Sequence, residues 1–66
     1  MANPQHLQLL RQGVTAWNQW REQNSDICPD LGQADLTGAN LELYNLANAN
    51  LDQAILAGAD LRNALL

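Results

Sequence analysis

Leucine recurs every five residues in the carboxyl-terminal half of the chain, and this period constrains the fold more than any other feature. On an α-helix, residues five apart are rotated by about 140°, and on a β-strand they alternate between the two faces. Neither element gathers such leucines on one side. A chain that turns a corner with every unit does, because each leucine then points toward one axis. The column consists of Leu31, Leu36, Leu41, Leu46, Leu51, Leu56, Leu61 and Leu66.

Alanine stands two residues before most of these leucines. A narrow interior accommodates one large and one small side chain per side at native packing density. Tyr44 occupies one of the small positions, so we expect either a distorted first coil or a ring that points outward beside the preceding helix. The alanines of this second column are Ala34, Ala39, Ala49, Ala54, Ala59 and Ala64.

The units resemble the pentapeptide-repeat family, whose consensus is A(D/N)LXX, and the resemblance covers residues 29–66. They are PDLGQ, ADLTG, ANLEL, YNLAN, ANLDQ, AILAG, ADLRN and ALL. The resemblance implies an all-β solenoid, a right-handed quadrilateral β-helix of about two coils with leucine and alanine inside. Residues twenty apart would stack, with Leu31 over Leu51, at a strand spacing of about 4.8 Å.

The preceding residues predict one amphipathic helix over residues 4–23. Asn3 is a good helix cap, and Pro4 has a preset φ that suits the first helical position. The segment WNQWR followed by PDL is similar to the amino-terminal lead-in of cyanobacterial members of the family. We therefore divide a single domain into a capping helix with its linker (1–28) and the repeats (29–66). The apolar stripe expected to cover the first coil consists of Leu7, Leu10, Val14 and Trp17.

No constellation of residues suggests catalysis, a metal site or a cofactor, and we expect no enzyme. His6 is predicted to be a surface residue without a nucleophile or an orienting acid. Cys28 cannot form an internal disulfide, and we interpret it as a half-buried filler with a reactive thiol as the alternative. The carboxylates of the repeats are assigned to a solvated outer wall. They include Asp30, Asp35, Asp52 and Asp60.

The 66 residues carry a formal charge of −4 and contain no lysine. Without a basic patch, direct nucleic-acid binding is not expected, and no small-molecule ligand is indicated either. No segment approaches the roughly 18 apolar residues of a membrane span, and the amino terminus does not resemble a leader peptide. The sequence therefore predicts a cytoplasmic protein without membrane contact.

The carboxyl-terminal coil is the expected contact surface, because nothing in the sequence predicts a cap for it. We expect it to bind a protein partner or another copy of the chain through Leu61, Leu65 and Leu66. Leu43, Ile55 and Leu65 are apolar at outer positions. They are either scattered surface residues or part of such a contact surface.

A binding or structural module is thus the function that the sequence favours. The family suggests an alternative, an acidic DNA mimic that inhibits a type II topoisomerase, although two coils span only about 10 Å. A further alternative is an N-terminal fragment, or a minimal designed version, of a longer solenoid.

Overall fold

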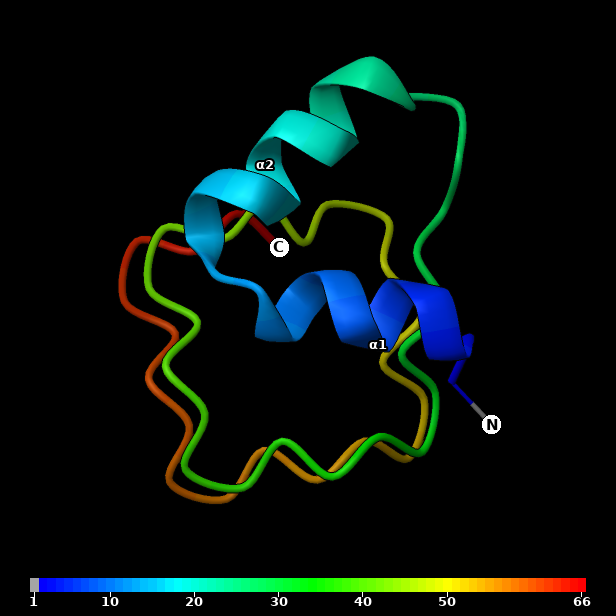
Figure 1. The fold of residues 1–66 in the computed structure, drawn as a ribbon. Helices are drawn as coiled ribbons and strands as arrows, with labels where there is room; N and C mark the ends of the chain where they lie inside the picture. The colour runs from blue at the N-terminus through cyan, green and yellow to red at the C-terminus, as the bar shows by residue number, and fades with distance from the viewer. Residues whose placement is uncertain (1) are drawn as a thin grey trace.

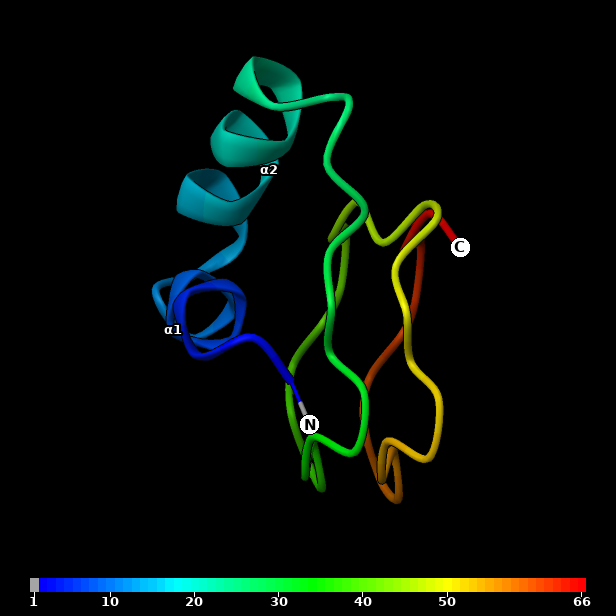
Figure 2. The same ribbon diagram turned by 90° about the vertical axis from the view of Figure 1, so that its right-hand side faces the viewer.

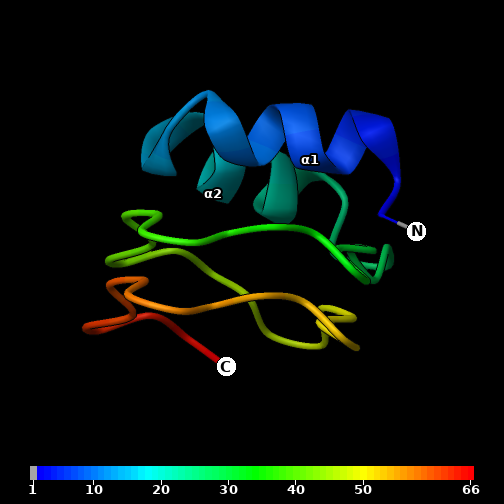
Figure 3. The ribbon, with the colours of Figure 1, turned by 90° about the horizontal axis from the view of Figure 1, so that it is seen from below.

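The computed structural model describes residues 2–66, which form a layer of two helices on one end of a four-sided coil. The helices are α1 (Pro4–Arg11) and α2 (Val14–Gln23). From residue 30 the chain winds twice around the same four-sided path (Figures 1 and 2). We call residues 30–49 the first turn and residues 50–66 the second turn. Both helices lie against the first turn, and the second turn lies on the far side (Figure 3).

The single helix expected over residues 4–23 is wrong, because the chain breaks between Arg11 and Val14. Gly13 lies at the break with φ 116°, a backbone conformation that side-chain-bearing residues rarely adopt. The predicted start is present: the side-chain oxygen of Asn3 accepts a hydrogen bond from the Gln5 N–H at 2.9 Å. The break lets α1 and α2 take different directions, so that each covers a different part of the first turn (Figure 1).

The prediction of an all-β solenoid is also wrong. Residues 2–66 contain two α-helices and no β-strand, and therefore no sheet. The two turns are connected only by isolated parallel bridges, because two residues of every five form a turn and leave one bridging residue per side. The twenty-residue register expected from the period is nevertheless present. The bridges join Asp30 to Asn50, Asp35 to Ile55, Asn40 to Asp60 and Asn45 to Leu65.

Each corner of the coil places one residue in the left-handed region of φ. The alanine or tyrosine that follows this residue donates its N–H to the preceding leucine carbonyl, as Ala34 does to Leu31 at 3.1 Å. Glycine and asparagine tolerate this conformation, whereas leucine does so at a cost. The residues with positive φ are Gln33, Gly38, Leu43, Asn48, Gln53, Gly58 and Asn63.

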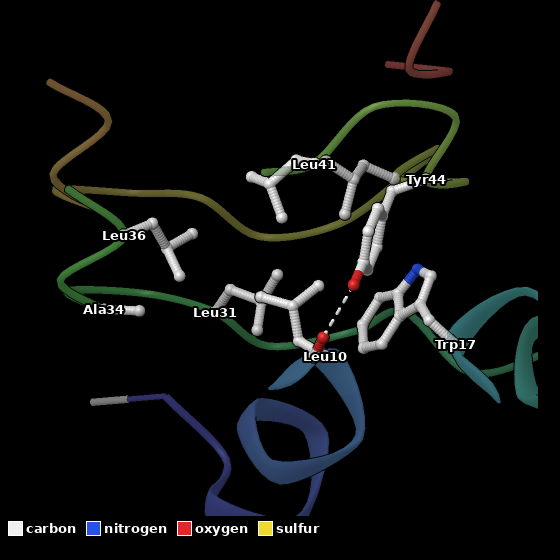
Figure 4. Packing of buried hydrophobic residues seen from close by; sticks show 8 residues of the cluster. Leu10, Trp17, Leu31, Ala34, Leu36, Leu41 and Tyr44 are labelled. Atoms are coloured by element: carbon white, nitrogen blue, oxygen red, sulfur yellow. Dashed lines mark hydrogen bonds between the residues drawn. The ribbon is translucent and has the colours of Figure 1, made fainter. Parts of the chain in front are cut away.

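The core lies between the helices and the first turn (Figure 4). Its buried members are Leu10, Trp17, Leu31, Ala34, Leu36, Leu41, Tyr44 and Leu46. The second turn contributes less, because Leu51, Leu56 and Leu61 are only half-buried and Leu66 is exposed. The partly buried positions also include Leu7, Val14, Ala39, Ala49, Ala54, Ala59 and Ala64. Neither helix of the described chain is long and apolar enough to cross a bilayer.

Candidate functional site

The backbone groups on the helix side of the first turn define the candidate site. In the second turn, the Asn50 N–H donates to the Pro29 carbonyl at 2.7 Å, and the Asn50 carbonyl accepts from the Leu31 N–H at 2.8 Å. The second-turn bridging residues thus direct both backbone groups toward the first turn. Because the geometry repeats, the bridging residues of the first turn direct their backbone N–H and carbonyl groups toward the helices. These residues are Asp30, Asp35, Asn40 and Asn45.

Side chains of α2 bind the backbone groups of Asn45. The indole N–H of Trp17 donates to the Asn45 carbonyl at 2.8 Å. The side-chain oxygen of Asn18 accepts from the Asn45 N–H at 2.8 Å, and its amide nitrogen donates to the Leu43 carbonyl at 3.0 Å. Trp17 and Asn18 therefore supply the two hydrogen bonds to Asn45 that a preceding turn would otherwise make.

The start of the chain does the same for Asp30. Its carbonyl accepts from the Asn3 N–H at 3.0 Å, and its N–H donates to Nδ1 of His6 at 3.0 Å. The imidazole of His6 is half-buried, and its centroid lies 5.0 Å from that of Trp20. The predicted surface position for His6 is therefore wrong, because the imidazole is a hydrogen-bond acceptor at the junction between helix and coil.

Asp35 and Asn40 have no such cap. Across residues 2–66, no group accepts from their backbone N–H groups or donates to their carbonyls. Neither helix crosses the ribbon of residues 33–40, drawn in green in Figure 1. We call these two sides of the first turn the open edge. The helices thus cap the Asp30 and Asn45 sides and leave the two sides between them uncapped.

Arg21 holds α2 against the coil and the linker. Its side chain is only 7% exposed, and its guanidinium donates to the carbonyls of Ile27 at 3.2 Å and Ala47 at 2.6 Å. Its buried Nε has no partner among the described residues. The sequence did not indicate that Arg21 is buried and Arg11 exposed, because the two carbonyls that bind Arg21 belong to residues outside the helix.

Tyr44 points out of the coil toward the helices, which is the second of the two placements expected for it (Figure 4). Its ring is 5% exposed and its hydroxyl donates to the Leu10 carbonyl at 2.9 Å. Burial raises the pKa of the phenol above its ordinary value. The ring lies beside Trp17, with centroids 6.3 Å apart. Tyr44 therefore anchors the helix layer instead of filling the interior.

A sequence profile of pentapeptide repeats matches residues 30–66 in eight copies. The chain belongs to the pentapeptide-repeat family. No curated protein and no solved structure matches it. The family resemblance inferred from the leucine and alanine columns is thereby confirmed.

The second turn of this pentapeptide-repeat protein presents apolar groups to solvent. Leu65 and Leu66 are 58% and 71% exposed, Ile55 is also exposed, and Leu61 is half-buried. The N–H groups of Leu51, Leu56, Leu61 and Leu66 have no acceptor in the part of the chain that the structure describes. The proposed contact residues Leu61, Leu65 and Leu66 thus all lie on the turn that no helix covers.

The carboxylates of Asp35 and Asp60 in this pentapeptide-repeat protein have local structural partners. The hydroxyl and N–H of Thr37 donate to Asp35 and lower the pKa of its carboxyl. Arg62 does the same for Asp60, through its side chain first and its N–H second. Within residues 2–66, no group of three or more potential ligands is placed to hold a metal ion. The thiol of Cys28 is exposed.

Proposed function

We propose that this pentapeptide-repeat protein is a non-enzymatic interaction module that binds another protein, or a second copy of itself, through its second turn. The observation that carries the proposal is the difference between the two ends of the coil. Both helices lie against the first turn, and its central leucines Leu31, Leu36, Leu41 and Leu46 are buried. The second turn has the same repeat and lacks that cover. The cytoplasmic location of the protein stays a prediction, which cell fractionation would test.

The side chains of the second turn favour an apolar contact. Leu65 and Leu66 are among the most exposed large apolar residues, and the half-buried Leu61 lies near them in sequence. Apolar surface of this kind gains about 25 cal/mol per Å² when a partner removes it from water. A contiguous apolar patch is a common mark of a protein interface.

The backbone of the second turn favours a partner that adds hydrogen bonds. The first-turn leucines donate their N–H groups to the second turn, as Leu36 does to the Ile55 carbonyl at 2.8 Å. The equivalent N–H groups of Leu56 and Leu61 have no acceptor within residues 2–66. An unpaired edge of this kind pairs readily with another chain. A partner that presents carbonyl groups in the same register would satisfy it.

A site-specific photocrosslinker at Leu65 tests the proposal. In an extract of the source cells, or between copies of the purified chain, we expect a defined crosslinked product. We expect Leu66→Asp to remove it, because a carboxylate would enter an apolar contact. A crosslinker at Gln19, an exposed residue of α2 outside the second turn, is the control and is expected to give no such product.

Sedimentation of the purified chain over a range of micromolar concentrations separates the two kinds of partner. A rise in mass that Leu66→Asp abolishes indicates a second copy. A constant monomer mass combined with a defined crosslink in the extract indicates another protein. A monomer that gives identical crosslinks from Leu65 and Gln19 would contradict the proposal.

A further inference from the structure

A groove follows the open edge of the first turn. A cavity of about 350 Å³ lies between Leu7 of α1 and Asp35, and a second of about 340 Å³ lies between Leu10 of α1 and the Asp35 and Asn40 sides. A third, of about 290 Å³, continues past Asn40 to Val14. Consecutive cavities share Asp35 or Asn40 in their walls. Together they form one groove between the helix layer and the two uncapped sides.

Asp35 and Asn40 each present a backbone N–H and a backbone carbonyl to the groove, and these groups have no hydrogen-bond partner within residues 2–66. The other side of the same segment shows what satisfies such groups. Ile55 donates its N–H to the Ala34 carbonyl at 2.9 Å and accepts from the Leu36 N–H at 2.8 Å. An extended segment that lies on the helix side of Asp35 would present a carbonyl and an N–H in the same way. A polypeptide main chain would therefore match the free N–H and carbonyl groups on this side of the coil.

The other residues that line the groove indicate which side chains a ligand would need. Pro4 and Leu7 give the cavity beside Asp35 an apolar lining. The central cavity has a mixed polar and apolar lining, because Leu10, Leu36 and Tyr44 at its wall are almost fully buried. Arg11 lies at its border and is exposed, and it has no carboxylate within salt-bridge distance in residues 2–66. Arg62, in contrast, is paired with Glu42 and Asp60. A ligand with one apolar side chain and one carboxylate therefore complements this groove.

We propose that the groove binds an extended segment of a partner protein, which pairs through its main chain with Asp35 and Asn40 and places a carboxylate near Arg11. A segment of about five to seven residues is long enough, because the first turn itself joins the two positions in five. This surface is separate from the second turn. Either surface can therefore fail its test without affecting the other.

A peptide copied from this chain supplies a probe with the required register. Residues 53–61, QAILAGADL, already pair with the first turn from its opposite side. Bound in the groove as a capped synthetic peptide, they would place the N–H of Leu56 on the Asp35 carbonyl and that of Leu61 on the Asn40 carbonyl. The matched control is the same peptide with these two amides N-methylated, which removes the donors and retains the side chains.

Titration of the isotopically labelled full chain, followed by amide NMR, is the test. We expect saturable shifts and slower hydrogen exchange at the amides of Asp35 and Asn40, and little change at Asp30 and Asn45, which already have acceptors. Arg11→Gln is expected to weaken binding up to about fivefold, as exposed ion pairs do. Gln12→Ala, at an exposed neighbouring position, is expected to leave it unchanged.

Three outcomes would overturn the proposal. The first is the absence of any saturable shift with the peptide. The second is equal binding of the N-methylated peptide, which would show that the main chain is not recognised. The third is a set of shifts confined to the second-turn leucines, which would place the peptide on that turn instead.

Discussion

The hydroxyl of Tyr44 donates a hydrogen bond to the Leu10 carbonyl at 2.9 Å, and this contact ties the repeat to the last turn of α1 (Figure 4). Carbonyls in the last turn of a helix lack intrahelical partners and must find others. The tyrosine that interrupts the alanine column therefore serves the junction between the two parts of the molecule.

Tyr44→Phe tests this contact. The substitution retains the ring and removes the donor, which leaves the buried Leu10 carbonyl with only a long contact to the Gly13 N–H at 3.5 Å. We expect a loss of about 1–2 kcal/mol in the free energy of unfolding, measured by urea denaturation. Thr37→Ser, which keeps an exposed hydroxyl, should change little. An unchanged midpoint for Tyr44→Phe would show that water replaces the phenol.

Asn18→Ala removes two of the hydrogen bonds that cap the Asn45 side. The side chain of Asn18 binds the Leu43 carbonyl and the Asn45 N–H. We expect a destabilisation of about 1–3 kcal/mol and faster hydrogen exchange at the Asn45 amide. Gln19→Ala, on the exposed face of the same helix, is the control and should lie within about 0.5 kcal/mol of the unmodified chain. Equal effects of the two substitutions would mean that helix propensity dominates.

Arg21→Lys separates the geometry of the guanidinium from its charge. The two carbonyls that Arg21 binds belong to Ile27 and Ala47, and a single ammonium does not reproduce the planar fork that spans them. We expect a loss of about 1–3 kcal/mol in thermal or chemical unfolding. The same change at the exposed Arg11 is expected to be nearly neutral. If Arg21→Lys is neutral as well, the buried position requires only a positive charge.

Leu43→Asn is expected to stabilise the chain. Leu43 has φ 69° and is 55% exposed, so the leucine side chain opposes the required backbone conformation and contributes little burial. Asparagine tolerates this conformation, and we expect a gain of about 0.5–1 kcal/mol in the free energy of unfolding. Leu43→Ala gives no such relief and serves as the control. A loss of stability in both variants would indicate that the leucine side chain packs usefully at the corner.

Thr37→Val is expected to raise the pKa of Asp35. The Thr37 hydroxyl is the largest cause of the lowered pKa, and the Thr37 N–H is the second. Because the folded-state pKa lies below the ordinary value of 3.8, the associated stabilisation is present above that value and is lost as the pH falls through the folded-state pKa. Carboxyl carbon shifts in an NMR titration measure the change. The Asp60 carboxyl, which Arg62 holds, should titrate as before.

The repeat half of the chain was largely predictable because its determinants are local. The five-residue period specified the family and the register of twenty residues between Asp30 and Asn50. It did not specify strands, because the number of bridging residues per side depends on how sharply each corner turns. The result is a coil joined by single bridges instead of an all-β structure.

The helical part of the chain, which precedes the repeats, was predictable only in part. Asn3 and Pro4 marked the start of a helix, and the apolar stripe marked its buried face. The break at Gly13 was missed because a glycine inside a helical pattern usually costs stability without ending the helix. The contact residues of the proposed second-turn surface remain predictions, and the structure adds that they lie away from the helices.

The sequence alone determined the five-residue repeat, and with it the family, and the start of the amino-terminal helix, since both follow from residue type and spacing. Only the tertiary structure decided which backbone groups of the first turn are capped. His6, Trp17 and Asn18 reach partners that lie 24 to 28 residues away along the chain. Such pairs depend on the angle at which two helices meet the coil, and no local pattern specifies that angle.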